Sequence, residues 1–214
     1  MINYDPKHVW PIFRPKTPPQ PLIPKIIHQI WLGDRAARMD QIKAWKDKNP
    51  SWTHIFWNKT NLQGWRFHNE DKLDLMSETA GKCDIMRYEI LYHLGGIYID
   101  SKMPAQQLDE SMFQYDCTAV IEGPGGLLSS DFLACQPRCE LMRLCVEGMN
   151  KVASPAWWYV GSAYLTHISQ SHNYPIKVYP EEKPPVEIHC RRQGVMAYYG
   201  YKIKRPATQL IKCR

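Results

Sequence analysis

Residues 83–100 hold the side chains that are best suited to chemistry in this sequence, in the order Cys-Asp-Ile-Met-Arg-Tyr-Glu-Ile-Leu-Tyr-His-Leu-Gly-Gly-Ile-Tyr-Ile-Asp. On a helix, Asp84, Arg87 and Tyr88 occupy positions i, i+3 and i+4, so their side chains share one face. A carboxylate beside a guanidinium stays ionised and accepts hydrogen bonds from hydroxyl groups such as those of a sugar. The alternative is an ordinary ion pair on a solvated helix face, which contributes only about 0.2–0.5 kcal/mol.

The elements that must position these residues alternate along the chain between strand and helix. The run 26–32 is almost continuously apolar, which is typical of a strand buried on both faces. Gly95 stands where a left-handed residue would end a helix. The expected elements are a strand over 26–32, a helix from Met39 to Asn49-Pro50, a strand over 54–57, a helix over 79–94, strands over 97–100 and 118–122, a helix opened by Pro137, and short strands around 176–179, 186–190 and 195–201. This order predicts an α/β fold with a mostly parallel sheet covered by helices on both faces.

The ends of two predicted strands carry further candidate residues. The first strand ends on Trp31-Leu32-Gly33, and the strand over 97–100 ends on Asp100-Ser101-Lys102. In parallel sheets, ligands bind outside the carboxyl ends of the strands. We therefore expect both stretches to line one crevice.

The composition describes a folded chain without signals for export or membrane insertion. Its 214 residues suffice for one large domain or two small ones, and 8 Trp and 12 Tyr against 12 Gly exclude the disordered and fibrous classes. No run approaches the roughly 18–20 apolar residues that span a bilayer, and the first residues lack the pattern of a signal peptide. Seven cysteines form no recognisable disulfide framework, so reduced thiols are expected. These features favour the cytoplasm or another reducing compartment and predict no transmembrane segment.

The net charge of +6 suits an anionic ligand without selecting one. A nucleic acid is not the expected partner, because acidic residues interleave with the basic ones and no basic stripe with alternating aromatics occurs.

The two ends of the chain differ from its centre. Residues 1–24 hold seven of the 17 prolines and predict an extended arm that lies against the body, with a proline-rich ligand for a partner as the alternative. Residues 202–214 hold five basic residues and no acidic one, which predicts a solvated tail or, as the alternative, a contact with a membrane surface or an anion. The central residues 25–201 are expected to form a single domain.

Three ordered blocks carry a resemblance to a known family. The first is Ile-Pro-Lys-Ile-Ile-His-Gln-Ile-Trp-Leu-Gly over 23–33, with Trp45, Asn49-Pro50, Trp52 and Trp57 after it. The second is Asp84-x-x-Arg87 followed by Gly-Gly-Ile-Tyr-Ile-Asp over 95–100, and the third, weaker block is Val-Gly-Ser-Ala-Tyr-Leu-Thr over 160–166. In these blocks the sequence resembles family 32 of the glycosyltransferases and its relatives, which include yeast-type α-1,6-mannosyltransferases and the catalytic domains of large glucosylating toxins.

The resemblance implies a GT-A fold for the central domain, which is a Rossmann-like, nucleotide-binding mixed sheet flanked by helices. It also implies transfer of a sugar, with retention at the anomeric carbon, from a nucleoside-diphosphate-sugar to a hydroxyl group of a glycan or glycoprotein acceptor. A UDP-sugar is the favoured donor and a GDP-sugar the alternative. Asp84 and Arg87 would hold the donor sugar, and Asp100 would face the ribose, a metal ion, or both. The donor-binding residues implied are Trp31, Leu32, Gly33, Tyr98, Ile99, Ser101, Gly161 and Ser162.

Several of these roles have ordinary structural alternatives. Trp31 would stack on the nucleobase, or it would be a plain core residue. Tyr98 would line the diphosphate side of the donor, or it would be a simple strand residue. Asp131, in the run Ser-Ser-Asp-Phe, is a candidate acid or base on the acceptor side, and its alternative is a helix or turn cap.

The sequence departs from the family at the metal site, where Asp100-Ser101-Lys102 replaces the usual Asp-x-Asp. In an extended chain, residues i and i+2 point the same way, so Lys102 occupies the direction of the second carboxylate. Lys102 would then pair with the diphosphate in place of a metal, or it would turn to solvent while Asp100 holds Mn²⁺ or Mg²⁺. His189 is the candidate further metal ligand, with a structural histidine as the alternative.

Two functions follow from this site. The first is an active glycosyltransferase, in which a positioned cation stabilises the diphosphate leaving group and Arg87 adds to the positive field. The second is a degenerate module of the same fold that binds a nucleotide or glycan because Lys102 has removed turnover.

Overall fold

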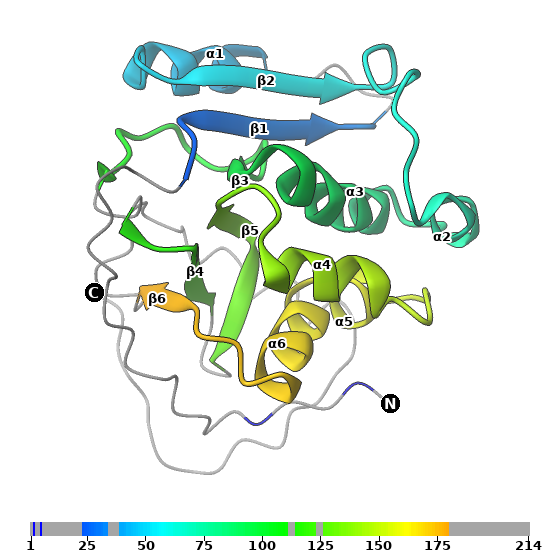
Figure 1. Ribbon diagram of the computed structural model, residues 1–214. Helices are drawn as coiled ribbons and strands as arrows, with labels where there is room; N and C mark the ends of the chain where they lie inside the picture. The colour runs from blue at the N-terminus through cyan, green and yellow to red at the C-terminus, as the bar shows by residue number, and fades with distance from the viewer. Residues whose placement is uncertain are drawn as a thin grey trace, which may run out of the picture.

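The computed structural model describes residues 2, 5, 23–33, 39–110, 114–122 and 126–179 (Figure 1). In chain order the elements are β1 (Ile26–Trp31), α1 (Met39–Lys48), β2 (Thr53–Asn58), α2 (Glu70–Leu75), α3 (Thr79–Leu94), β3 (Gly96–Ile99), β4 (Cys117–Glu122), β5 (Leu127–Cys135), α4 (Glu140–Glu147), α5 (Ala156–Tyr159), α6 (Ser162–Ser171) and β6 (Lys177–Tyr179). Within these ranges, no helix is both long and apolar enough to cross a membrane.

The six strands form one mixed sheet in the order β2-β1-β3-β5-β4-β6. Strand β1 runs parallel to β2 and β3, and β6 runs parallel to β4. Strand β5 is antiparallel to both β3 and β4. The mostly parallel sheet expected from the alternation of elements is therefore wrong in its second half, because β5 was not predicted. A mixed sheet is nevertheless what the family resemblance implies.

Two apolar cores lie on opposite faces of the sheet, and β3 shows the alternation that separates them. The side chain of Tyr98 belongs to the core shared with α3 to α6, whereas Ile97 and Ile99 belong to the core that contains Trp45 of α1. Figure 1 shows α3, α4 and α6 grouped on one side of β3 and β5, to their right in this view. The indole of Trp45 donates a hydrogen bond to the Met103 carbonyl at 3.1 Å, which ties α1 to the turn after β3.

Helix α3 ends as its sequence predicts. Gly95 has φ +62°, and its N–H bonds to the Leu91 carbonyl at 2.8 Å. A Cβ at Gly95 would lie 2.6 Å from Cδ of Pro137, so only glycine fits this turn.

His28 of β1 fixes the same turn from inside the sheet. Its Nδ1 accepts from the indole of Trp57 at 3.1 Å, because an indole nitrogen can only donate. Its Nε2 therefore carries the proton and donates to the Gly95 carbonyl at 2.8 Å. Burial lowers the pKa of His28 to about 4, so the ring is neutral at pH 7.

Most predicted elements are confirmed over the described residues. The helix over 79–94 has the expected bounds, and β1, α1, β2, β3, β4, α4 and β6 match their predicted segments within a few residues. Helices α2, α5 and α6 were not predicted. The strands expected around 186–190 and 195–201, the basic tail and most of the proline-rich arm lie outside the described residues. Asp5 of that arm bonds through its backbone to the side chain of Gln170 on α6.

Candidate functional site

Asp84 and Arg87 form a buried ion pair on the face of α3 that meets the sheet. Asp84 Oδ1 lies 3.0 Å from Arg87 Nη1, and the two side chains are 8% and 3% exposed. The alternative of an ordinary pair on a solvated helix face is therefore wrong. Burial alone would lower the pKa of the Arg87 guanidinium, but the charge of Asp84, with Tyr98 and Asp131, raises it above its ordinary value. The guanidinium is thus a fixed positive charge.

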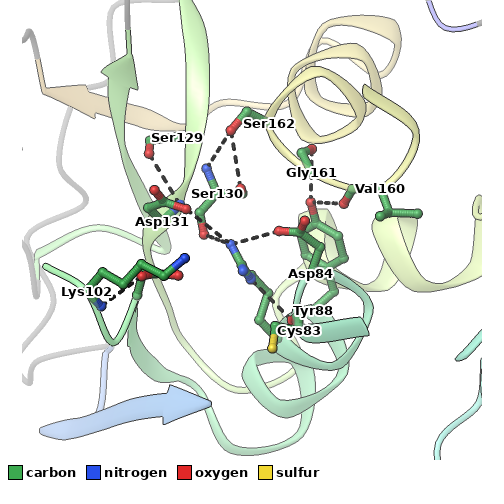
Figure 2. A network of polar contacts seen from close by, with 12 residues as sticks. Cys83, Asp84, Tyr88, Lys102, Ser129, Ser130, Asp131, Val160, Gly161 and Ser162 are labelled. Carbon is green, nitrogen blue, oxygen red and sulfur yellow. Dashed lines mark hydrogen bonds and ion pairs between the residues drawn. The ribbon is translucent and has the colours of Figure 1, made fainter. Parts of the chain in front are cut away.

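Arg87 also joins α3 to the two central strands. Figure 2 shows Asp84 of α3 and Ser130 and Asp131 of β5 on either side of this contact. Its Nη1 donates to the Ser130 carbonyl of β5 and lies 3.9 Å from Asp131 Oδ1. Its guanidinium carbon lies 4.1 Å from the centroid of the Tyr98 ring on β3, which is a cation–π contact. The helix residue predicted from sequence therefore has partners that the sequence did not reveal.

Asp100 and Asp131 face each other across β3 and β5. Ile99 pairs with Phe132 in the antiparallel register, so the next residue of β3 stands opposite Asp131. The backbone N–H of Asp100 donates to the Asp131 carbonyl at 2.9 Å. Burial, and then the charge of Asp131, raise the pKa of the Asp100 carboxyl above its ordinary value. Asp131 is a strand residue here, not a helix or turn cap.

Lys102 touches the site through its backbone. Its N–H donates to Asp100 Oδ1 at 2.9 Å, and the N–H of Met103 donates to the Asp100 carbonyl at 2.9 Å, so a tight turn follows the strand. The Lys102 side chain is exposed, and no ion pair joins its ammonium to a carboxylate of the described residues. Ser101, between them, is buried.

Tyr98 has a buried hydroxyl group with an unmet hydrogen bond. The residue is fully buried, and its hydroxyl has no hydrogen-bond partner in the part of the chain that the structure describes. Its ring stands on the same face of β3 as Asp100, because residues i and i+2 of a strand point to one side. A buried hydroxyl without a partner among the described residues, on a ring that feels the charges of Asp100 and Asp131, is an arrangement that a polar ligand would complete. Ile99 points the other way, into the second core.

The loop between α5 and α6 closes the site beside Asp84. The hydroxyl of Tyr88 donates to the Val160 carbonyl at 2.8 Å and anchors this loop to α3. A Cβ at Gly161 would lie 3.2 Å from Asp84 Oδ2 and 2.7 Å from the Cα of Trp157, so glycine keeps space next to the carboxylate. Ser162 is buried, and its hydroxyl accepts from the backbone N–H of Ser130 at 3.1 Å, which places it among the supports of β5.

Trp31, Leu32 and Gly33 lie at the same edge of the sheet as the carboxylates. His28 of β1 is level with Tyr98 of β3, so counting along the parallel strands places Trp31 level with Ser101. All three residues are half-buried. The structure therefore brings together both strand ends that were expected at one crevice. The candidate metal ligand His189 lies outside the described residues.

Within the described residues, the carboxylates of Asp100 and Asp131 are the candidate ligands for a metal ion. No group of three or more histidine, cysteine, aspartate or glutamate side chains among the described residues could hold one. Asp100 and Asp131 nevertheless offer hard oxygen ligands on one face of adjacent strands, and Mg²⁺ commonly takes only one or two protein carboxylates besides substrate phosphates. The site thus fits a divalent cation that a nucleotide diphosphate also coordinates.

A surface cavity of about 310 Å³ lies elsewhere, at the last turn of α3. It is lined by Tyr92, His93 and Arg143, with Arg66, Phe67, His68, Val146 and Glu147. His93 follows Asp84 by nine residues, which is about 13 Å along a helix. We place the candidate site at the buried charges instead. Burial of an ionised group costs folding free energy, and such groups are concentrated at functional sites.

Part of the chain matches a family of known proteins. Residues 36–117 match the family described as a glycosyltransferase sugar-binding region containing a DXD motif. The resemblance to the DXD glycosyltransferases is confirmed. The matched region contains α3, β3 and the carboxylates Asp84 and Asp100, although this chain has Lys102 in place of the second aspartate of the motif.

Two fungal relatives align with the chain. Inositol phosphoceramide mannosyltransferase 2 of Schizosaccharomyces pombe is 27% identical over 149 residues, which cover 64% of this chain and 41% of that protein. Mannosyl phosphorylinositol ceramide synthase SUR1 of Saccharomyces cerevisiae is 29% identical over 166 residues, which cover 71% of this chain and 40% of that protein. The chain therefore spans about two fifths of the length of these glycosyltransferase relatives.

Two solved structures share the fold. One is PaToxG Glycosyltransferase, with a TM-score of 0.51, 17% identity and coverage of 73% of this chain and 72% of that one. The other is the ligand-free glycosyltransferase domain from the YGT toxin, with a TM-score of 0.57, 10% identity and coverage of 75% and 81%. The expected GT-A fold is confirmed.

Proposed function

We propose that this protein transfers a sugar from a nucleoside-diphosphate-sugar to a hydroxyl group of an acceptor. The observation that carries the proposal is the buried Asp84–Arg87 pair, which stands beside Asp100 and Asp131 at the carboxyl end of β3. The match to the sugar-binding region over 36–117 supports it.

In this proposal Asp84 is the acceptor of hydrogen bonds from the hydroxyl groups of the donor sugar. Its ion pair with Arg87 keeps it charged, and a charged acceptor forms stronger hydrogen bonds than a neutral one. Gly161 lies close to the second oxygen of Asp84, where a Cβ would stand 3.2 Å from that atom. Trp31, at the same sheet edge, would stack on the base of the nucleotide.

The reaction breaks the bond between the anomeric carbon and the phosphate oxygen and forms one from that carbon to the acceptor oxygen. The departing diphosphate takes up the electron pair of the broken bond, and one of its oxygens accepts the proton that the acceptor hydroxyl loses. Positive groups near the phosphates lower the barrier, because they stabilise charge that develops in the transition state. A divalent cation at Asp100, when bound, supplies such charge. The exposed Lys102 ammonium supplies it from the chain itself.

The relatives' names guide the choice of substrates. Both are named for mannosyl transfer to an inositol-containing ceramide phosphate. We therefore propose that a mannosyl or related hexosyl donor and an acceptor with sugar-like or inositol hydroxyls are tested first, with UDP and GDP donors in parallel.

A thermal-unfolding screen of sugar nucleotides tests the proposal. A ligand that binds only the folded state stabilises it by about 2.7 kcal/mol at 100 times its Kd, which raises the unfolding midpoint of a chain of this size by about 5–10 °C. We expect this shift for one donor class, and we expect Asp84→Asn to abolish it. The absence of a shift with every UDP- and GDP-sugar, with and without Mn²⁺, would contradict the proposal.

Lys102 favours a second candidate, a binding module that has lost turnover. Such a module would show the same thermal shift, but the bound donor would be neither hydrolysed nor transferred. Chromatographic detection of released UDP or GDP, measured against Asp100→Ala, separates the two functions.

A further inference from the structure

We infer that Asp131 supplies the second carboxylate of a divalent-cation site shared with Asp100, in place of the motif position that Lys102 occupies. The inference rests on the proposed function, because the cation would bind together with the donor diphosphate. It assigns Asp131 to the donor side of the reaction, whereas the sequence suggested a role on the acceptor side.

The first step of the argument is the strand register. Ile99 pairs with Phe132 and Tyr98 with Leu133, so Asp100 stands opposite Asp131 in an antiparallel pair. Directly opposed residues point to the same face of a sheet, with Cβ atoms about 4.5–5.5 Å apart. Two like charges in that position destabilise the sheet unless a cation lies between them. A cation bound between Asp100 and Asp131 would therefore be stabilised.

The second step concerns the cations that the chain itself offers. Arg87 is already paired with Asp84 at 3.0 Å, it donates to the Cys83 and Ser130 carbonyls, and it reaches Asp131 only at 3.9 Å. Two carboxylates, those of Asp84 and Asp131, therefore lie against one buried guanidinium. Lys102 is exposed, and its ammonium forms no ion pair with a carboxylate within the described residues. Asp100 forms no ion pair with a side chain of the described residues.

The third step is the fit to a hard ion. The Lys102 backbone amide holds one oxygen of Asp100 at 2.9 Å and so orients the carboxylate. Asp131 is 22% exposed, so it can reach a ligand at the surface of the site. The hydroxyl of Tyr98, fully buried on the same strand face and without a partner among the described residues, is an independent sign that a polar ligand belongs there. Mg²⁺ and Mn²⁺ sites in nucleotide-using enzymes need few protein carboxylates beyond the phosphates.

A Mn²⁺ titration followed by electron paramagnetic resonance tests the inference on the full chain, with UDP and GDP as probe nucleotides. We expect Asp131→Asn to lower the Mn²⁺ affinity at least about tenfold. Asp74→Asn, an exposed aspartate of α2, is the matched control and leaves the affinity unchanged. Lys102→Ala removes a repulsive charge and tightens Mn²⁺ binding. The double variant Asp131→Asn with Lys102→Asp restores the motif and regains affinity lost in the single variant.

Circular dichroism first shows that each variant is folded. Three results then distinguish failure of the inference from failure of the proposed function. Unchanged Mn²⁺ affinity in Asp131→Asn overturns the inference. Nucleotide binding that persists in EDTA but is lost in Lys102→Ala also overturns it and gives the cation role to the lysine, while the proposed function stands. A wild-type chain that binds neither UDP nor GDP under any of these conditions contradicts the proposed function as well.

Discussion

Arg87 is the residue that makes the candidate site a structural unit. A single guanidinium contacts Asp84 on its own helix, the Ser130 carbonyl on β5 and the ring of Tyr98 on β3. Charges buried to this degree persist only when they are paired, because an unpaired buried ion carries a large desolvation cost. Arg87 therefore supports the fold and the site together.

Arg87→Ala is expected to lower the free energy of unfolding by about 3–5 kcal/mol, because it leaves Asp84 as a buried charge without its partner. Urea denaturation of the two proteins measures the difference. The matched control is Arg143→Ala, which breaks the exposed pairs of Arg143 with Glu140 and Glu147 and should cost far less. Equal losses in the two variants would show that the Arg87 pair is as solvated as a surface pair.

Tyr98→Phe separates a ligand-binding hydroxyl from a structural one. Removal of a buried hydroxyl that has no partner among the described residues should leave the free energy of unfolding unchanged or raise it by up to about 1 kcal/mol. Donor affinity, measured by calorimetry, should fall in the same variant. A large loss of stability with normal donor affinity would mean that the hydroxyl has a structural partner.

At the scale of elements, the sequence predicted what local periodicity encodes. Helix α3 has the predicted bounds because its apolar spacing and Gly95 are both local signals. Strand β5 was missed because Ser-Ser-Asp at its centre is typical of a turn. These polar residues are buried only because α6 supplies partners: Ser162 for Ser130, and Thr166 for the N–H of Leu128. Such long-range compensation leaves no periodic pattern.

The candidate site was likewise predictable from sequence only where the signal is local. Asp84, Arg87 and Asp100 came from an ordered motif, and the structure brings them together. The position of Asp131 opposite Asp100 depends on the strand register, and the packing of Gly161 against Asp84 depends on how two helices meet. Neither can be read from spacing in one sequence.

Gly161→Ala tests the close approach of α5 to the site. The new methyl group would lie 2.7 Å from the Cα and 3.0 Å from the carbonyl oxygen of Trp157, and backbone atoms cannot move aside easily. We expect a loss of about 1–3 kcal/mol in unfolding free energy, together with weaker donor binding. In contrast, a Cβ at Gly64 would meet nothing within 4 Å, so Gly64→Ala is the control that should retain both. Full donor affinity in Gly161→Ala would remove this loop from the site.

At the scale of the whole molecule, His28 makes stability depend on pH. Burial lowers its pKa to about 4 from 6.5, so between these values the unfolded chain binds a proton that the folded chain does not. Stability therefore falls as the pH drops from 6.5 toward 4, by about 3 kcal/mol from this group.

Urea denaturation at pH 7 and pH 4 checks this expectation. His28→Gln keeps a donor and an acceptor but replaces the buried ring, so we expect it to be less stable than wild type at pH 7. Because glutamine cannot titrate, the variant should lose less stability on acidification. Carboxylates titrate in both proteins and cancel in the difference. Identical pH profiles would show that His28 is protonated in the folded state or is not buried.

The central claim concerns the whole chain: a charged cluster at the end of β3 holds a sugar nucleotide for transfer. The most direct test incubates the protein with UDP- and GDP-hexoses and Mn²⁺ and follows the anomeric proton signals of the donor by nuclear magnetic resonance. The account predicts that the signals of one donor are consumed by wild type, and that this consumption falls at least about a hundredfold in Asp84→Asn, a loss of roughly 2.7 kcal/mol in transition-state stabilisation. Donor consumption at the same rate in wild type and in a folded Asp84→Asn variant would contradict it.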